Sequence, residues 1–173
     1  NTIMNVGLPS IVREVGASQA QLQWLIDSYT IVFACLLLTM GAIGDKWGRH
    51  RTLMIGLVIF GGFSAFASQA DSANALIIAR GLMGIGGALI LPATLAILSN
   101  TFEGKERSKA IGIWAAVAGI GVAAGPLFGG FLLDHFWWGS IFLINVPICV
   151  IAVGMGWFLV PPSKSSDEGH RLD

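Results

Sequence analysis

Apolar residues occur along the chain in long runs that short polar segments separate. Five runs are complete: residues 21–43, 52–69, 74–98, 110–133 and 138–160. Each holds roughly 18–25 residues, enough for an α-helix to cross a hydrocarbon layer of about 30 Å. Residues 1–10 have the character of the end of a further run, and residues 161–173 are polar. The pattern predicts an all-α integral membrane protein with five spans, part of a sixth and a polar linker.

The composition supports a membrane environment. Of the 173 residues, 54% are hydrophobic and 12% are charged, whereas an average soluble domain carries about 25% charged residues. Ten basic residues balance ten acidic ones, so no net charge favours nucleic acid as a partner. These figures exclude a soluble enzyme of ordinary composition and a disordered regulator, and they predict the lipid bilayer as the surrounding medium.

Side chains suited to catalysis or metal binding are scattered. Cys35 and Cys149 both lie inside apolar runs, where packing is their expected role, and their spacing indicates neither a disulfide framework nor a metal site. His50, His135 and His170 fall in loops or in the polar tail. We therefore predict no enzyme activity, no metal and no bound cofactor.

Basic residues are distributed unequally between the two ends of the predicted spans. If the 44–51 loop faces the cytoplasm, that side collects Lys46, Arg49, Arg51, Lys105, Arg107, Lys109, Lys164 and Arg171. The opposite side keeps Arg13. Lys and Arg are enriched in cytoplasmic loops, so we predict a cytoplasmic-membrane protein with both ends of this segment in the cytoplasm. Four aromatic residues then fall at the outer interface: Trp24, Phe136, Trp137 and Trp138.

The loop after the first complete span combines glycine with charge. It carries Gly41, Asp45, Lys46, Gly48 and Arg49. The carboxylate can accept hydrogen bonds from a helix N-terminus, and the guanidinium can donate to a carboxylate or a carbonyl. By itself such a loop indicates a basic anchor that fixes the topology.

Arg80 lies inside the predicted span 74–98. A guanidinium at this depth costs at least a few kcal/mol unless it is paired or hydrated. We therefore predict that Arg80 faces the bundle interior or a water-filled cavity. An arginine that merely ties helices together is the alternative.

The span 110–133 contains a regular pattern of glycine and proline. Glycines three or four residues apart give a smooth helix face that a partner helix can approach closely, and a proline removes a backbone hydrogen bond and permits a kink. The pattern consists of Gly112, Gly121, Gly125, Pro126, Gly129 and Gly130.

These stretches together resemble the major facilitator superfamily. The glycine-rich charged loop is similar to the family's signature loop, and the segment around Arg80 to its fourth-helix motif, with Met83 where glutamine is common. The glycine and proline pattern is similar to the antiporter motif of the family's drug exporters. Residues 2–9 and 142–147 are similar to the first and sixth helices of its fourteen-helix drug:proton antiporter branch.

The resemblance implies an N-terminal six-helix bundle at residues 1–160 with a truncated first helix, followed by a cytoplasmic linker at residues 161–173. The C-terminal half of the same polypeptide would be a partner. In that family the signature loop latches the two halves in the outward-facing state, and the antiporter motif marks export. The resemblance further implies the proton motive force in place of a cofactor, with cationic amphiphilic drugs and protons as substrates.

Asp27 lies inside the span 21–43, about as far from the outer end as Arg80 lies in its own span. The two charges are therefore predicted at a similar depth, roughly 8–10 Å below the outer boundary. A carboxylate there can release its proton when an organic cation arrives and recover it when the cation leaves. We predict that this pair couples protons to cations; a static salt bridge is the alternative.

Four side chains, soft, aromatic or polar, are candidates to line a cavity for lipophilic cations. They are Tyr29, Met83, Trp114 and Asn145. Two functional alternatives stay open: a symporter or facilitator for a small metabolite, and a truncated membrane scaffold that does not transport, since alternating access needs two repeats.

Overall fold

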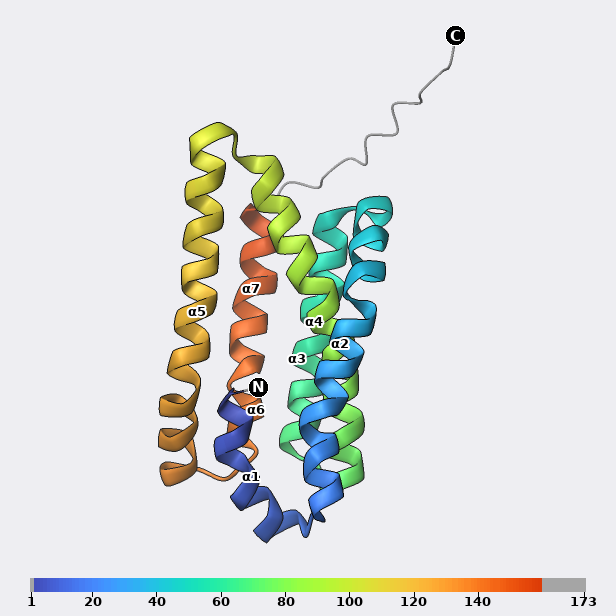
Figure 1. Ribbon diagram of the computed structural model, residues 1–173, viewed down its shortest axis with the longest axis vertical. Helices are drawn as coiled ribbons and strands as arrows, with labels where there is room; N and C mark the ends of the chain where they lie inside the picture. Colours follow the sequence, from blue (N-terminus) through green and yellow to red (C-terminus); the bar gives the residue numbers. More distant parts are fainter. Residues whose placement is uncertain (1, 160–173) are drawn as a thin grey trace.

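A computed structural model describes residues 2–159 of the chain, with side chains from residue 6 to residue 158, and this range is helical except for short connections. Figure 1 shows the elements: α1 (Thr2–Val15), α2 (Gln19–Trp47), α3 (Arg49–Ser68), α4 (Ala73–Thr101), α5 (Gly104–His135), α6 (Ser140–Leu143) and α7 (Asn145–Leu159). Five helical segments of this range are long and apolar enough to cross a membrane. The predicted all-α membrane fold is therefore confirmed.

Helices α2 and α4 begin before their predicted apolar runs because a serine caps each of them. Ser18 accepts a hydrogen bond from the backbone N–H of Gln21 at the start of α2, and Ser72 accepts one from Ala75 at the start of α4. Such caps satisfy donors that the first helical turn leaves free. The first helix likewise continues to Val15, five residues past the predicted end of its apolar run. The predicted linker, residues 161–173, lies outside the described residues.

The predicted span 138–160 is divided into α6 and α7, which meet at Ile144. Pro147 has no N–H and cannot donate to the carbonyl of Leu143, where a regular helix would place a hydrogen bond. Ile144 nevertheless keeps a helical backbone (φ −59°, ψ −26°). The two pieces therefore act as one membrane-length segment, Ser140–Phe158.

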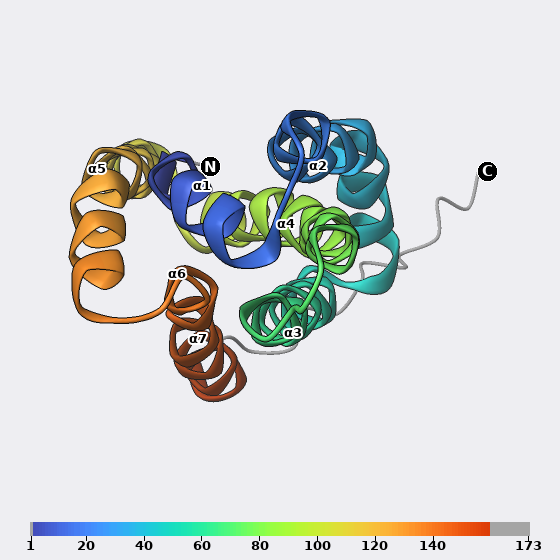
Figure 2. The same ribbon diagram turned by 90° about the horizontal axis from the view of Figure 1, so that it is seen from below.

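Helix α4 lies at the centre of one half of the bundle, between α2 and α3, and α7 packs on α3 (Figure 2). Helix α5 stands on the other side and packs mainly against α1. A hydrogen bond joins the first turns of α2 and α4, because Gln21 donates to the side-chain oxygen of Asn74 over 3.0 Å. Residues at equal distances along α2 and α4 therefore lie side by side.

The core consists of two clusters along the bundle. The larger joins α1, α2, α3, α4 and α6 near the start of α4, and includes the fully buried Ile11, Leu25 and Leu76. The smaller joins α3, α4 and α7 through Leu53, Ala93 and other buried residues. By contrast, most of α5 is exposed.

Glycine allows α3 and α4 to approach within backbone contact. A Cβ atom on Gly86 would lie 2.8 Å from the backbone nitrogen of Phe60 and 2.9 Å from the carbonyl oxygen of Gly56. We expect Gly86→Ala to separate the two helices and to destabilise the bundle by about 1–3 kcal/mol, the usual cost of overpacking. Thermal unfolding in detergent would measure it. The control is Gly62→Ala on α3, where a Cβ would meet no atom within 4 Å; equal melting temperatures for both variants would contradict the packing argument.

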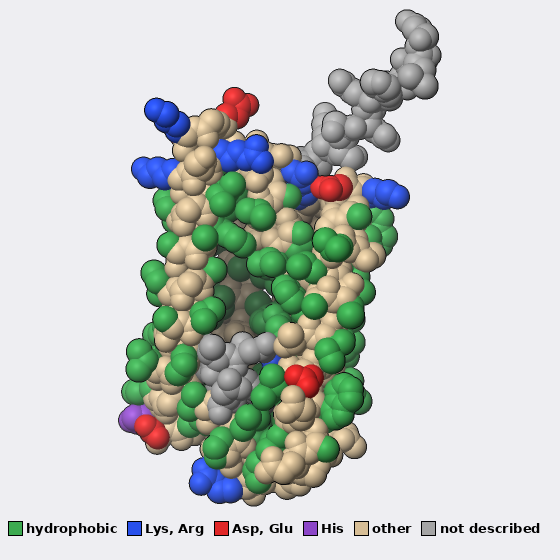
Figure 3. Space-filling model, viewed as in Figure 1, with side chains coloured by type: hydrophobic (Ala, Val, Ile, Leu, Met, Phe, Trp, Pro, Cys, Tyr) green, Lys and Arg blue, Asp and Glu red, His purple; other side chains and the backbone are tan. Residues whose placement is uncertain are grey.

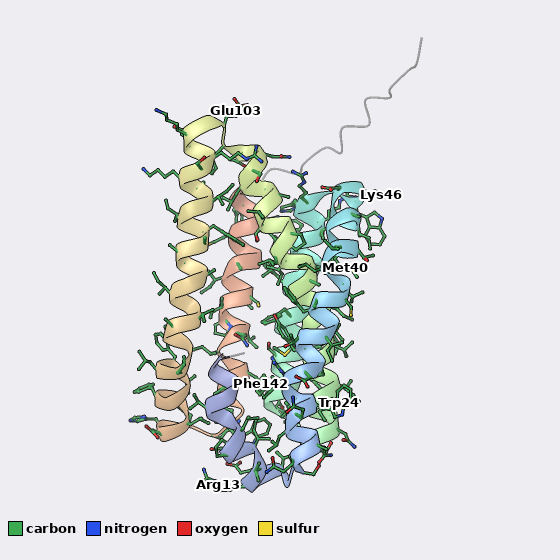
Figure 4. The ribbon with its side chains drawn as sticks, viewed as in Figure 1. Arg13, Trp24, Met40, Lys46, Glu103 and Phe142 are labelled. Carbon is green, nitrogen blue, oxygen red and sulfur yellow. The ribbon has the colours of Figure 1, made fainter. Side chains whose placement is uncertain are left out.

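Charged side chains gather at the two ends of the molecule (Figure 3). Arg13 lies at one end, and Lys46 and Glu103 lie at the other (Figure 4). We call the second end the basic end, because the helix ends and connections there carry Lys46, Arg49, Arg51, Lys105, Arg107 and Lys109. Lys164 and Arg171, predicted on the same side, lie outside the described residues.

Three of the four predicted interfacial aromatic residues are well exposed. Trp24, Phe136 and Trp137 have exposed fractions of 56%, 55% and 50%. Trp138 differs: it is 7% exposed and packs edge-on against Phe142, with ring centroids 6.3 Å apart. The turn after α5 therefore directs this ring into the core, and the interfacial depth of the four residues stays a prediction.

Candidate functional site

Arg80 is buried on α4 and binds to one turn of α2. Its side chain is 5% exposed. Its Nε donates a hydrogen bond to the carbonyl oxygen of Leu25 over 3.0 Å, and its guanidinium carbon lies 4.6 Å from the centroid of the Tyr29 ring. A buried guanidinium is tolerated only when its N–H groups are hydrogen-bonded and its positive charge is compensated by nearby groups. The backbone carbonyl and the aromatic face supply them here.

Asp27 lies on the same turn of α2, between the two residues that Arg80 contacts. It is partly exposed, and its Oδ2 accepts a hydrogen bond of 2.8 Å from Nε2 of Gln23. Asp45–Arg49 is the one ion pair among side chains that the structure describes. The predicted alternative of a static Asp27–Arg80 salt bridge is therefore wrong for this arrangement.

The two charges are instead connected through the backbone of α2. Leu25 and Tyr29 bracket Asp27, and Arg80 contacts both. A Cβ on Gly84 of α4 would lie 2.8 Å from the carbonyl oxygen of Tyr29, so the two helices touch closely here. Arg80 and Gly84 therefore hold this turn of α2 closely against α4.

Tyr29 fills the space between α2 and α4. Its ring stacks on Phe33 with centroids 5.8 Å apart, and its hydroxyl would lie 2.9 Å from a Cβ on Gly87. One face of the aromatic ring is occupied by Arg80. Of the four predicted cavity-lining side chains, Tyr29 is thus the one placed beside Arg80 and Asp27.

The other three predicted lining residues lie elsewhere. Met83 is 1% exposed, and its sulfur accepts a hydrogen bond from Ser64 of α3, so its placement in the core does not fit a lining role. Asn145 of α7 donates to the same Ser64 hydroxyl over 3.4 Å. Trp114 lines a groove of about 490 Å³ between α4 and α5, toward the basic end, with Leu91, Thr94 and Val117.

The residues of the predicted charged loop join four helices at the basic end. Arg49 donates two hydrogen bonds to Oδ1 of Asp45, from Nε over 3.2 Å and from Nη2 over 3.0 Å. Its Nη1 donates to the carbonyl oxygen of Ala96 on α4 over 3.0 Å. Gly48 forms the turn with φ +96°, a conformation that favours glycine. His50 further contacts the carbonyl oxygen of Gly156 on α7 over 3.0 Å. The loop therefore ties α2 and α3 to α4 and α7.

The remaining predicted loop residues have simpler surroundings. A Cβ on Gly41 would lie 3.6 Å from the Cβ of Pro92, so α2 and α4 also meet near the basic end. Lys46 is exposed. These positions are compatible with both a latch and an anchor.

The predicted antiporter pattern lies on α5, which continues through Pro126 as a single helix. A Cβ on Gly112, Gly121 or Gly130 would meet no atom within 4 Å. Gly129 is buried, and Gly125 is partly buried. At Gly112, Gly121 and Gly130, α5 therefore has open space beside it in the described part of the chain.

Sequence reasoning missed two groups in the site, Gln23 and the carbonyl of Leu25. A glutamine four residues before an aspartate on one helix is a signal for a side-chain contact. The backbone carbonyl of Leu25 gives no signal in the sequence, because every residue has a backbone carbonyl. It becomes a partner only through the register of α2 against α4.

Comparison with known proteins places the chain among transporters. A profile of the Major Facilitator Superfamily matches residues 1–172. The methyl viologen resistance protein SmvA of Salmonella typhimurium is 48% identical over 92% of this chain and 32% of its own length. The multidrug efflux pump LfrA of Mycolicibacterium smegmatis is 42% identical over 98% of this chain and 34% of its own length. The riboflavin transporter RibZ of Clostridioides difficile is 36% identical over 99% of this chain and 38% of its own length. The chain thus spans about a third of the length of these relatives.

Proposed function

The chain belongs to the Major Facilitator Superfamily, and we propose that it is the N-terminal part of a proton-coupled antiporter that exports lipophilic organic cations across the cytoplasmic membrane. Relatives that are named for drug resistance or multidrug efflux support export. The observation that carries the proton coupling is the placement of Asp27: a carboxylate about a quarter of the way along an apolar helix, held by a neutral side chain and not by Arg80.

A carboxylate in this position can exchange a proton for a cation. Ionised Asp27 attracts a lipophilic cation, and a proton that enters from outside neutralises the carboxylate and releases the cation. Proton entry supplies the work, since one elementary charge moving through 100 mV contributes about 2.3 kcal/mol. Arg80 would keep Asp27 in register by holding Leu25 and Tyr29.

The charged loop and α5 would serve the conformational cycle. Contacts of Arg49 with Asp45 and Ala96 support a latch at the basic end, which we place in the cytoplasm by the enrichment of Lys and Arg. The open space beside Gly112, Gly121 and Gly130 of α5 supports close approach by a helix from the C-terminal half of the same polypeptide. Alternating access then proceeds by rocking of the two halves.

A second candidate function is transport of a small metabolite, which the riboflavin transporter among the relatives favours. The two candidates differ in their driving force and in the charge of the cargo. In an antiporter the movement of a cation must consume the proton gradient. A facilitator would move its metabolite down its own gradient without one.

The test uses the full-length protein in vesicles with an acidic interior. We expect ethidium to accumulate against its gradient, to alkalinise the interior, and to leave when an ionophore collapses the pH difference. Riboflavin is the comparison cargo, and protein-free vesicles are the control. Riboflavin flux without ethidium-linked proton movement would favour the second candidate, and no flux of either would contradict both.

A further inference from the structure

We propose that Gln23 is a positioning residue for the Asp27 carboxylate, and that its carboxamide keeps a hydrogen bond to Asp27 in both protonation states. The inference rests on the proposed function, because it assigns a partner to the carboxylate that exchanges protons. It goes further by naming a neutral side chain that tunes this exchange.

The geometry of α2 brings the two side chains together. Gln23 and Asp27 are four residues apart on one continuous helix, so they share a face. Nε2 of Gln23 lies 2.8 Å from Oδ2 of Asp27, within the range of a charge-assisted hydrogen bond. This is the one hydrogen bond of Asp27 to a side chain in the described part of the chain, and it fixes the direction of the carboxylate.

A carboxamide suits a partner that changes its protonation state. The NH₂ group of glutamine donates to an ionised carboxylate, and its carbonyl oxygen accepts from the O–H of a protonated one. When a proton from the outer solution binds to Asp27, rotation of the Gln23 amide by about 180° replaces the first hydrogen bond with the second. One hydrogen bond exists before and after, and no charge is added to the site apart from the proton.

Among the residues that the structure describes, the charged groups on neighbouring elements are not hydrogen-bonded to Asp27, so Gln23 is the side chain that positions its carboxylate. On α4, Arg80 is directed to the Leu25 carbonyl and the Tyr29 ring. Asp71 precedes α4, and Arg13 and Glu14 lie near the end of α1; all three are exposed. The amide is therefore the group placed to respond when the Asp27 carboxyl gains or loses its proton.

The experiment measures initial ethidium efflux by the full-length protein against pH for three variants. Gln23→Leu removes the donor to the carboxylate, so the pH of half-maximal efflux should rise. Gln23→Lys adds a donor with positive charge, which stabilises the carboxylate, so the same midpoint should fall. Gln19→Leu, one turn earlier on the exposed surface of α2, should leave it unchanged.

The two opposite shifts distinguish positioning from a structural role, since a loss of stability would lower the maximal rate without moving the midpoint in two directions. An unchanged midpoint in Gln23→Leu, or a shift of both Gln23 variants in the same direction, would overturn the role of Gln23 while proton-coupled efflux itself stands. A wild-type efflux rate that does not vary with pH would instead overturn the proposed function, and with it this inference.

Discussion

Asp27→Asn is expected to reduce proton-coupled cation efflux to background while the bundle stays folded. The amide has nearly the same shape as the carboxyl group and can still accept the hydrogen bond from Gln23. It cannot bind or release a proton in the working pH range. The variant therefore keeps the local packing and loses the chemical event that joins the two fluxes. Ethidium-driven proton movement in vesicles would measure the loss.

Two controls make this result specific. Asp71→Asn changes an exposed aspartate ahead of α4 and is expected to transport normally, which excludes a general effect of surface charge. Thermal unfolding of Asp27→Asn should match the wild type. Proton-coupled efflux at the wild-type rate in Asp27→Asn would refute the assignment of Asp27 as the exchanging group.

The fold could be predicted because a bilayer imposes a simple rule on the sequence. Every backbone group within the hydrocarbon must be hydrogen-bonded inside its own segment, so a long apolar run between polar segments is a helix. The runs beginning at residues 21, 74 and 110 accordingly fall inside α2, α4 and α5, and the run beginning at residue 52 ends one residue beyond α3. Helix ends were harder to predict, because capping by Ser18 and Ser72 depends on side-chain geometry and not on hydropathy.

The site could be predicted in part. A charged residue in an apolar run stands out, so Asp27 and Arg80 were found, and their similar depth followed from counting residues. Their partners did not follow, because in the structure Arg80 uses a backbone carbonyl and a ring on α2 instead of the nearby carboxylate. The rotation of each helix about its axis decides between these options, and a uniformly apolar helix carries little sequence record of that rotation.

The positions of the apolar residues Met83 and Trp138 are equally hard to predict from the sequence. Both are large residues in segments whose faces are all hydrophobic, so composition cannot tell core from surface. In the structure Met83 points to Ser64 of α3, and Trp138 packs on Phe142. Contacts between helices, which a single sequence does not display, determine these positions.

Arg80→Ala is expected to abolish efflux and also to lower stability by about 2–4 kcal/mol, because it removes a charge-assisted hydrogen bond and a cation–π contact from a buried position. Arg80→Lys restores the charge but not the planar group that donates to the Leu25 carbonyl while it lies over Tyr29. We expect the lysine variant to regain much of the stability and little of the transport.

Measuring stability and efflux separately tests whether Arg80 acts through the turn of α2 that carries Asp27. Tyr29→Phe keeps the ring beneath the guanidinium and should transport almost normally, whereas Tyr29→Leu removes the ring and should behave like Arg80→Lys. Thermal unfolding and ethidium efflux of the same preparations would supply both quantities. If Arg80→Lys restores stability and efflux together, the arginine only holds the helices in place. If stability returns without efflux, the orientation of residues 25–29 is itself required for transport, as the contacts of Arg80 imply.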